Sequence, residues 1–455
     1  MPYEGEFAQY RSIKRLTESE RVKKLLGSYK NRSAASFGRS LDTILVPALQ
    51  PSGWLPRVVL AVDGSHIEIP VQNGFPGAEA SYVTVASVLV DLAKVLELDT
   101  ARPVDPKEFR KTEKADSIDC ALPGCNVVST GAGSAEESLR QKVYEVFNDV
   151  RMIDDCETLA ETYEVLLAHK PATSEEPNCP YDDCPLVGKK YKRGNGAYAC
   201  ICPRQKPLFS TDALRFHEGM NEAGTNGAMF AEVMQVLERI WIIHILRMME
   251  AKGWLGILRD MAIVLDGPLA VFGHPAWLSQ AIYKELSRLN QLAKPKIGGQ
   301  DILIVGIEKT GRFVEHLDQI DTHQNGTSGL FPSQSAALLD DNYIKKNIIF
   351  SESDKQYGDQ SYFGRKFFYK TKSGAKIVAI LPFLEEAHRD LKQARVDQYP
   401  RLADTMSLLD RVVSSRYPNA LTPLISAHAE AAIPLNLGKR VLEQLARELM
   451  NEGSL

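Results

Sequence analysis

Runs of apolar residues with two different periods divide the chain into predicted strands and helices. Two short runs rich in β-branched residues, 57–62 and 66–69, flank Asp63-Gly64-Ser65, which is predicted to be a tight turn between two strands. A third run, 82–90, is mostly apolar and β-branched, as is typical of a central strand. Apolar residues at helical spacing predict a long, largely buried helix from Ala228 to about Lys252.

The second half of the chain alternates between strand and helix patterns. The predicted elements are a strand over 261–265, a helix over 275–292, a strand over 302–307, strands near 361–369 and 376–381, and a helical C-terminal third. Three consecutive strands followed by helix–strand alternation predict an α/β fold with a mixed sheet flanked by helices. This is also the element order of a ribonuclease-H-like core.

Two segments lie outside this predicted core and define the domain boundaries. Residues 1–56 hold a charged helical segment, a possible contact for a partner or for a second copy of the chain, and end in a proline-rich stretch. Residues 57–99 form the first part of the core. Residues 100–225 hold all seven cysteines, and are predicted to be an insertion with its own small folded unit. Residues 226–455 form the remainder of the core.

The overall composition is that of an ordinary globular protein, with 44% apolar and 25% charged residues among 455. The net charge of −4 lacks the basic excess usual in nucleic-acid binders, so any basic contacts must be gathered locally or supplied by a partner. A polar start predicts no signal peptide, and the lack of an apolar run of about 18 residues predicts no membrane span. Together with the odd cysteine count, this predicts a cytoplasmic protein.

Two strands of the predicted core end on Asp-Gly, at Asp63-Gly64 and Asp266-Gly267. A carboxylate at the edge of a sheet is held rigidly, and the glycine after it leaves room for a ligand. Two such carboxylates on neighbouring strands repel one another unless a divalent cation lies between them. Mg²⁺ or Mn²⁺ suits these oxygen ligands and can support phosphodiester cleavage. Because Asp-Gly is also a common turn dipeptide, an ordinary turn remains the alternative for each.

The segments around the two aspartates resemble the acidic motifs of the NurA family of nucleases. Val62-Asp63-Gly64-Ser65 is similar to the family's N-terminal motif, and Leu265-Asp266-Gly267-Pro268-Leu269 is similar to its second acidic motif. The resemblance covers about 57–90 and 228–440, and its motifs follow one another in the family's order.

Three later segments carry the same resemblance. Ile304-Val305-Gly306-Ile307-Glu308-Lys309 is similar to a family strand that is followed by lysine. Arg395-Val396-Asp397 resembles an Arg-Val-acid segment, with Asp in place of the commoner Glu. Tyr417-Pro418 and Ala427-His428 resemble the last motif, with a slightly longer gap between them.

The resemblance implies one more acidic residue, on the helix before Asp266. Glu238 is the favoured candidate, because it is embedded in the apolar part of that helix, where a carboxylate needs a partner such as a metal. Glu250 lies near the helix end, closer in sequence to Asp266, and remains a second candidate. The implied ligands of a catalytic Mn²⁺ or Mg²⁺ are Asp63, Glu238, Asp266 and His428.

The remaining candidate catalytic residues also take their roles from the resemblance. His428 would complete the metal shell or transfer a proton. Lys309 would contact the scissile phosphate as a point charge. Tyr417 would position the substrate, and Asp397 is a further acidic candidate. The plain alternatives are a hydrogen-bonded histidine near a helix start, a surface lysine and a core tyrosine.

Four cysteines have a spacing that suits tetrahedral Zn²⁺. Cys179 and Cys184 are followed, after fifteen residues, by Cys200 and Cys202. The spacers within the pairs differ from the usual two residues, so unliganded thiols remain an alternative. Cys120 and Cys125 form another pair, which either replaces one of the first two pairs or consists of buried thiols.

The residues and the resemblance together predict a divalent-metal-dependent DNA nuclease, acting as endonuclease, exonuclease or both. The resemblance implies a homodimer that works with a HerA-type hexameric ATPase, in antiphage defence or in DNA end processing. One alternative is a non-catalytic ribonuclease-H-like adaptor that binds nucleic acid or a partner ATPase. A lower-ranked alternative is a nuclease of the same fold that acts on RNA or is guided by it, since the chain shows no guide-binding module.

Overall fold

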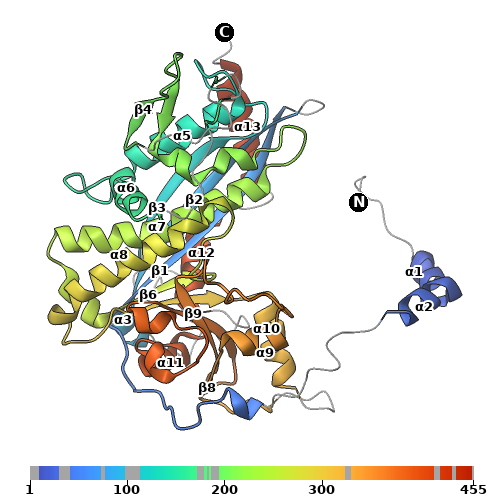
Figure 1. Ribbon diagram of the computed structural model, residues 1–455, viewed down its shortest axis with the longest axis vertical. Coiled ribbons are helices and arrows are strands. Elements are labelled where there is room, and N and C mark those ends of the chain that lie inside the picture. Colours follow the sequence, from blue (N-terminus) through green and yellow to red (C-terminus); the bar gives the residue numbers. More distant parts are fainter. Residues whose placement is uncertain are drawn as a thin grey trace.

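The computed structural model describes residues 10–29, 41–72, 77–97, 113–171, 179–181, 184–185, 194–322, 329–414, 421–432 and 437–452. Its centre is an eight-stranded sheet with the strand order β3-β2-β1-β6-β7-β10-β9-β8 (Figure 1). These strands are β1 (Val58–Gln72), β2 (Ala78–Asp91), β3 (Glu113–Pro123), β6 (Met261–Asp266), β7 (Ile304–Glu308), β8 (Ser335–Leu338), β9 (Gly364–Lys370) and β10 (Lys376–Pro382). Two short strands, β4 (Ala197–Ala199) and β5 (Pro207–Phe209), form a separate hairpin.

The sheet is mixed, as the order of strand and helix patterns predicts. β1, β2 and β3 form an antiparallel meander, whereas β6 is parallel to β1 and β7 is parallel to β6. β10, β9 and β8 continue the sheet in antiparallel fashion from β7. The parallel strands β1, β6 and β7 therefore lie at its centre, where both faces are covered.

β1 is one continuous strand, so the predicted turn at Asp63-Gly64-Ser65 and the separate strand after it were wrong. Asp63 pairs with Ala86 of β2 and Ser65 pairs with Thr84, without a break in the ladder between them. The hairpin with β2 satisfies the backbone hydrogen bonds at these positions, which removes the need for a turn. Side chains continue to alternate between the two faces of β1 through Asp63, and this aspartate occupies a position on the face where the preceding residues are apolar.

The first part of the predicted insertion belongs to the core. Glu113–Pro123 is strand β3 of the main sheet, paired along its length with β2. The next two helices, α5 (Ala135–Asp149) and α6 (Leu159–Ala168), bury Leu139, Phe147 and Tyr163 in the main apolar core. Their alternating and helical apolar positions are diluted by polar residues, which is why composition alone suggested a separate unit.

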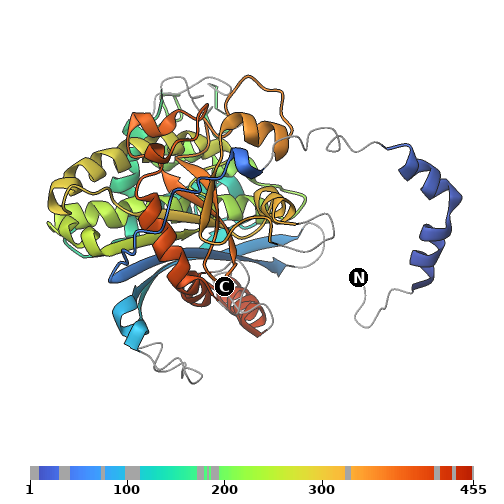
Figure 2. The same ribbon diagram turned by 90° about the horizontal axis from the view of Figure 1, so that it is seen from below.

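Helices cover the two faces of the sheet and form two apolar cores. One face packs against α5, α6, α7 (Gly227–Ala251) and α8 (Leu278–Ala293), and contributes Leu60, Val62 and Leu265. The other face packs against α11 (Leu402–Val412) and α12 (Thr422–Ala431), and contributes Val59, Ala61 and Val264. In Figure 2 the green and yellow helices lie on one side of the blue strands, and the red C-terminal helices lie mainly on the other.

A third apolar cluster lies at the β8 end of the sheet. It is formed by α9 (Arg312–Ile320), α10 (Asp341–Asn347) and neighbouring strands. Ile44 joins this cluster, and Leu45 forms a bridge with Ala337 of β8. The end of the N-terminal segment thus covers the edge strand, which leaves fewer unpaired backbone groups there.

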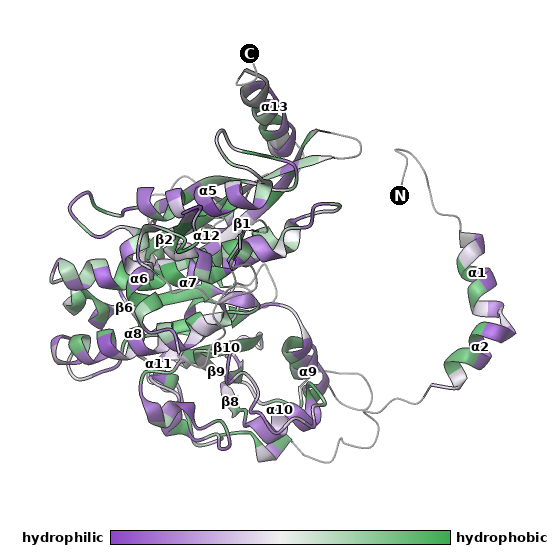
Figure 3. Cartoon of the chain, turned by 45° about the horizontal axis from the view of Figure 1, so that its top comes forward, coloured by the Kyte–Doolittle hydropathy of each residue, from purple (hydrophilic) through white to green (hydrophobic). Residues whose placement is uncertain are grey.

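The remaining helices lie at the periphery. α1 (Tyr10–Glu18) and α2 (Glu20–Gly27) expose Leu16, Leu25 and Leu26, and Figure 3 shows hydrophobic and hydrophilic positions mixed along both helices. α3 (Leu92–Glu97) follows β2, and α13 (Leu437–Glu452) ends the described chain. Within the described residues, no helix combines the length and the apolar character that crossing a membrane requires.

Candidate active site

Asp63 and Asp266 lie side by side at the point where β6 ends. Val62 of β1 is aligned with Leu265 of β6 in parallel register, so the next residue on each strand is one of the two aspartates. Asp63 lies on the same face of the sheet as Val59 and Ala61. Asp266 lies on the same face as Ala262 and Val264, which belong to the same apolar core. Because side chains alternate along a strand, both carboxylates point to the face covered by α12.

The buried Asp63 carboxyl carries a strongly perturbed pKa. Burial, with repulsion from Asp266 as the next cause, raises the pKa of Asp63 from 3.8 to about 6. His428 of α12 and Lys309 after β7 partly offset this rise. The His428 Nδ1 lies 2.9 Å from an Asp63 oxygen, and Lys309 Nζ donates to Asp266 at 2.6 Å. The structure therefore brings these four predicted residues into one group.

Glu238 reaches β1 from α7, on the opposite face of the sheet from the Asp63 and Asp266 carboxylates. Its side chain is buried, and it forms an ion pair with Arg239. A Cβ atom placed on Gly64 would lie 2.5 Å from Glu238 Oε1, which is closer than real Cβ contacts allow. Gly64 is thus required by the close approach of this carboxylate to β1, and not by a turn.

Arg239 is a residue of this group that the sequence interpretation missed. It is buried, and its Nη2 donates to the Pro268 carbonyl at 3.1 Å. Burial lowers the pKa of Arg239 to about 10, although the charges of Asp266 and Asp63 act in the opposite direction. A charged pair within an otherwise apolar helix was the available signal, since such a pair is costly unless it has partners.

Two predicted candidates, Glu250 and Asp397, lie away from this group. Glu250 lies about three turns further along α7 than Glu238, and both its oxygens accept hydrogen bonds from Arg288 at 2.6–2.7 Å. Asp397 pairs with Arg395 on the surface, and its electrostatic neighbours are that arginine and His388. Tyr417 lies outside the described residues.

The acidic group has the chemistry of a site for a hard divalent cation. Asp63 and Asp266 offer carboxylate oxygens from two neighbouring strands, with the exposed imidazole of His428 beside Asp63. Glu238 approaches β1 from the other face. Among the described residues, the acidic side chains and His428 do not gather within the 4.8 Å that the cysteine group described below shows. Each carboxylate has a basic side chain as its neighbour, which is His428 for Asp63, Lys309 for Asp266 and Arg239 for Glu238. The raised pKa of Asp63 reflects burial and the repulsion from Asp266, and a divalent cation would relieve that repulsion.

A second group of candidate ligands lies at the β4–β5 hairpin. The sulfur atoms of Cys179, Cys184 and Cys200 gather within 4.8 Å of one another, and Cys200 lies 3.9 Å from each of the other two. Tetrahedral Zn²⁺ with Zn–S distances near 2.3 Å requires sulfur separations of about 3.8 Å. The donor set and its spacing therefore fit zinc.

Cys202, the fourth predicted ligand, is buried in the same small apolar cluster, but it is not among the three cysteines whose sulfur atoms gather within 4.8 Å of one another. Burial opposes ionisation of Cys202, but hydrogen bonds with Cys200 and with the backbone of Arg204 lower the pKa of its thiol. Cys120 and Cys125 lie elsewhere, with their thiols against the carbonyls of Val83 and Gly224. They do not replace either pair in the described cluster.

The fold and this site define an α/β protein with an acidic group at the end of a central parallel strand. The NurA domain model matches residues 57–433. The chain belongs to the NurA family.

Solved NurA structures resemble the chain at low sequence identity. The crystal structure of the NurA nuclease from Sulfolobus solfataricus is 11% identical, with 98% of each chain covered and a TM-score of 0.39. A second crystal structure, of NurA, is 13% identical, with 97% of this chain and 98% of that chain covered and a TM-score of 0.31. The chain matches no curated protein.

Proposed function

We propose that this NurA-family protein is a divalent-metal-dependent nuclease that hydrolyses phosphodiester bonds of DNA. The observation that carries this proposal is the parallel register that sets Asp63 beside Asp266, with Glu238 against the next residue of β1. Three acidic groups held by separate rigid elements suit metal-assisted phosphoryl chemistry. Family membership supports the same conclusion.

Asp63, Asp266 and Glu238 would hold Mn²⁺ or Mg²⁺. The bound ion would polarise the phosphate and activate water. Lys309 pairs with Asp266, and would turn to the scissile phosphate once the carboxylate has another partner. His428 is bonded to Asp63 while 62% of its side chain is exposed, so it can complete the metal shell or exchange a proton with solvent. Tyr417 remains our candidate for positioning the substrate.

The wider proposal is a homodimer that acts with a HerA-type hexameric ATPase in antiphage defence or DNA end processing. The exposed apolar positions of α1 and α2 support a protein contact in the N-terminal segment. The order β3-β2-β1-β6-β7, with three antiparallel strands before two parallel ones, supports a ribonuclease-H-like core. A structural Zn²⁺ on the four cysteines completes the proposal.

A cleavage assay with matched variants tests the catalytic proposal. Asp63→Asn and Asp266→Asn should each reduce cleavage more than about 100-fold, because each removes a candidate metal ligand. Asp397→Asn and Glu250→Gln should retain activity, because these carboxylates pair with arginines away from the group. The assay uses labelled duplex DNA, single-stranded DNA and RNA with Mn²⁺ or Mg²⁺, and thermal unfolding checks that each variant folds.

The same assay separates the alternatives. Full activity of both aspartate variants would refute the assigned site, and preference for RNA would refute the DNA specificity. A second candidate is a non-catalytic nucleic-acid-binding adaptor, and it is favoured by the basic side chain that already pairs with each carboxylate. Binding of DNA without cleavage by the wild-type chain, alone and with its partner ATPase, would support that adaptor.

A further inference from the structure

An open cleft of about 600 Å³ lies directly beside the candidate active site. Its volume is in the range of sites that bind small ligands or single nucleotides. It extends from the end of β6 and β7 towards α9 and the loop before β9. The lining residues used below are Asp266, Phe272, Lys309, Arg312, Tyr362 and Lys366.

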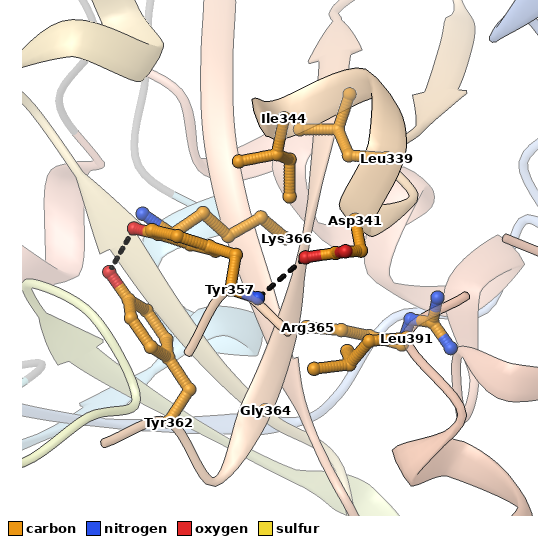
Figure 4. Close-up of a pocket in the computed structure, with 9 residues that line it drawn as sticks. All are labelled: Leu339, Asp341, Ile344, Tyr357, Tyr362, Gly364, Arg365, Lys366 and Leu391. Atoms are coloured by element: carbon orange, nitrogen blue, oxygen red, sulfur yellow. Dashed lines mark hydrogen bonds between the residues drawn. The ribbon is translucent and has the colours of Figure 1, made fainter. Parts of the chain in front are cut away.

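One wall of the cleft is aromatic. Phe272 is a large apolar residue that is 43% exposed. Its ring meets the ring of Tyr362 at 81°, with the centroids 5.6 Å apart, so Tyr362 covers at most one face of Phe272. The Tyr362 hydroxyl lies 2.9 Å from that of Tyr357, and Figure 4 shows the two hydroxyl groups facing each other beside Lys366. Tyr362 is thus held in place, and Phe272 retains a ring face that can stack on another flat group.

The charges that line the cleft leave one cation available for an anion. Lys309 is paired with Asp266, and Lys366 is paired with Glu308 at 2.5 Å. Arg312 is exposed, and within the part of the chain that the structure describes it has no ion-pair partner. It is the first residue of α9, where the unpaired N–H groups of the helix also favour an anion. The forked guanidinium group of an arginine at this position can donate two hydrogen bonds to a phosphate group.

We propose that this cleft binds a nucleotide of a single-stranded substrate next to the scissile phosphate, with its base on Phe272 and a phosphate on Arg312. This inference rests on the proposed nuclease function, because Asp266 and Lys309 border both sites. A single strand is favoured over a duplex, since only an unstacked base offers its face to an aromatic side chain. The cleft would thus select the frayed or unpaired end of a strand.

Binding without turnover tests this inference. The dissociation constant of a fluorescein-labelled oligothymidylate is measured by anisotropy, with Ca²⁺ in place of Mn²⁺ and again in EDTA. Phe272→Ala should weaken binding about five-fold to 100-fold, and Phe272→Trp should retain it. Arg312→Ala should weaken binding and reduce its salt dependence. A blunt duplex should respond much less to Phe272→Ala.

The matched control is Trp254→Ala. Trp254 is 44% exposed, close to the value for Phe272, but it lies before the first residue of β6, whereas Asp266 is the last residue of that strand. Equal binding by folded Phe272→Ala and Trp254→Ala would overturn the inference, whether or not the wild type cleaves DNA. If Phe272→Ala loses binding and Trp254→Ala does not, but the wild-type protein cleaves no DNA, the binding cleft is supported and the nuclease proposal is refuted. Comparison of oligodeoxyuridylate with oligouridylate, which differ only in the sugar, identifies the preferred sugar.

Discussion

Gly64 and Gly267 each follow a candidate metal ligand, but different physical causes require a glycine at the two positions. Gly64 has an extended backbone within β1, and its missing side chain leaves room for Glu238. Gly267 directly follows the last residue of β6, has a positive φ of 87°, and lies against the Arg239 guanidinium. The same dipeptide therefore marks a continuous strand in one case and a strand end in the other.

The role of Gly64 leads to a prediction for Gly64→Ala. The added methyl group would collide with Glu238 Oε1 and Met234 Cγ, so Glu238 would have to move away from β1. We expect a loss of about 1–3 kcal/mol in the free energy of unfolding, and cleavage reduced about ten-fold or more if Glu238 is a ligand. Urea unfolding and the cleavage assay measure the two effects.

Gly256→Ala is the matched control for that change. The nearest atom to a Cβ at Gly256 is 3.9 Å away, so the same methyl group fits there without displacing a neighbour. Equal activity of Gly64→Ala and wild type would show that the position of Glu238 does not matter for catalysis.

At the scale of elements, the long hairpin of β1 and β2 and the helix α7 build the candidate site. β6 stops at Asp266, whereas β1 continues to Gln72 paired with β2 alone. Because of this difference in length, Asp63 lies in the middle of β1 but beside the end of β6. α7 crosses the opposite face and delivers Glu238 and Arg239 on adjacent positions. A carboxylate at this junction is held rigidly while its surroundings on one side remain open.

The cysteine-containing hairpin is tied to the core through a buried ion pair. Arg140 of α5 donates two hydrogen bonds to Asp212, at 2.7 and 2.8 Å. The same guanidinium lies 4.7 Å from the ring centroid of Tyr181, which lies between Cys179 and Cys184 in the sequence. A metal on the cysteines would therefore hold Tyr181 against α5.

Loss of one cysteine tests the zinc proposal. Cys200→Ser removes the sulfur that lies closest to two others, so we expect less than about half a zinc per chain by elemental analysis, and faster proteolysis of the hairpin. Cys120→Ser is the control, because the Cys120 thiol on β3 contacts the Val83 carbonyl on β2 instead. Wild-type protein purified without zinc, yet equally resistant to protease, would contradict a structural metal.

At the scale of the whole molecule, the two apolar cores on either side of the sheet enclose several charged groups. Asp63, Glu238 and Arg239 are among the buried residues, at 3–5% exposure. Such burial costs free energy unless the charges are compensated, and a fold retains it where the charges have a use. The stability of the metal-free chain should therefore depend on the ionisation of Asp63.

Asp63→Asn gives a pH-dependent prediction for the metal-free protein. A carboxyl with a pKa raised from 3.8 to about 6 binds its proton more tightly in the folded state. Its contribution to stability is therefore fully present below the unfolded-state pKa and is lost as the pH rises through about 6. At pH 7.5 the variant should be more stable than wild type by up to about 3 kcal/mol, and near pH 4 the difference should shrink.

Urea unfolding in EDTA at the two pH values measures this difference. Excess Mn²⁺ should stabilise wild type at pH 7.5 and not the variant, because binding to the folded state alone adds stability. A variant that is less stable than wild type by the same amount at both pH values would contradict the raised pKa of Asp63.

The sequence by itself determined the strands around the central sheet, the long buried helix α7 and the candidates Asp63, Asp266 and the four cysteines. These features depend on local periodicity and on short motifs, and both are visible within a few residues of chain. The prediction of a mixed sheet with helices on its faces was confirmed for the same reason. Family resemblance supplied Lys309 and His428, whose spacing alone would not distinguish them from ordinary surface residues.

Only the tertiary structure decided which distant residues meet. The register of β1 against β6 places Asp63 beside Asp266, and the three turns between Glu238 and Glu250 separate one candidate from the site. β1 proved continuous and β3 joined the sheet because backbone pairing with β2 outweighed the local turn and loop composition. The burial of Arg239 beside the acidic residues and the cleft at Phe272 were recognised only in the tertiary structure. Strand register and burial depend on contacts between residues that are far apart in the chain, and no local pattern encodes those contacts.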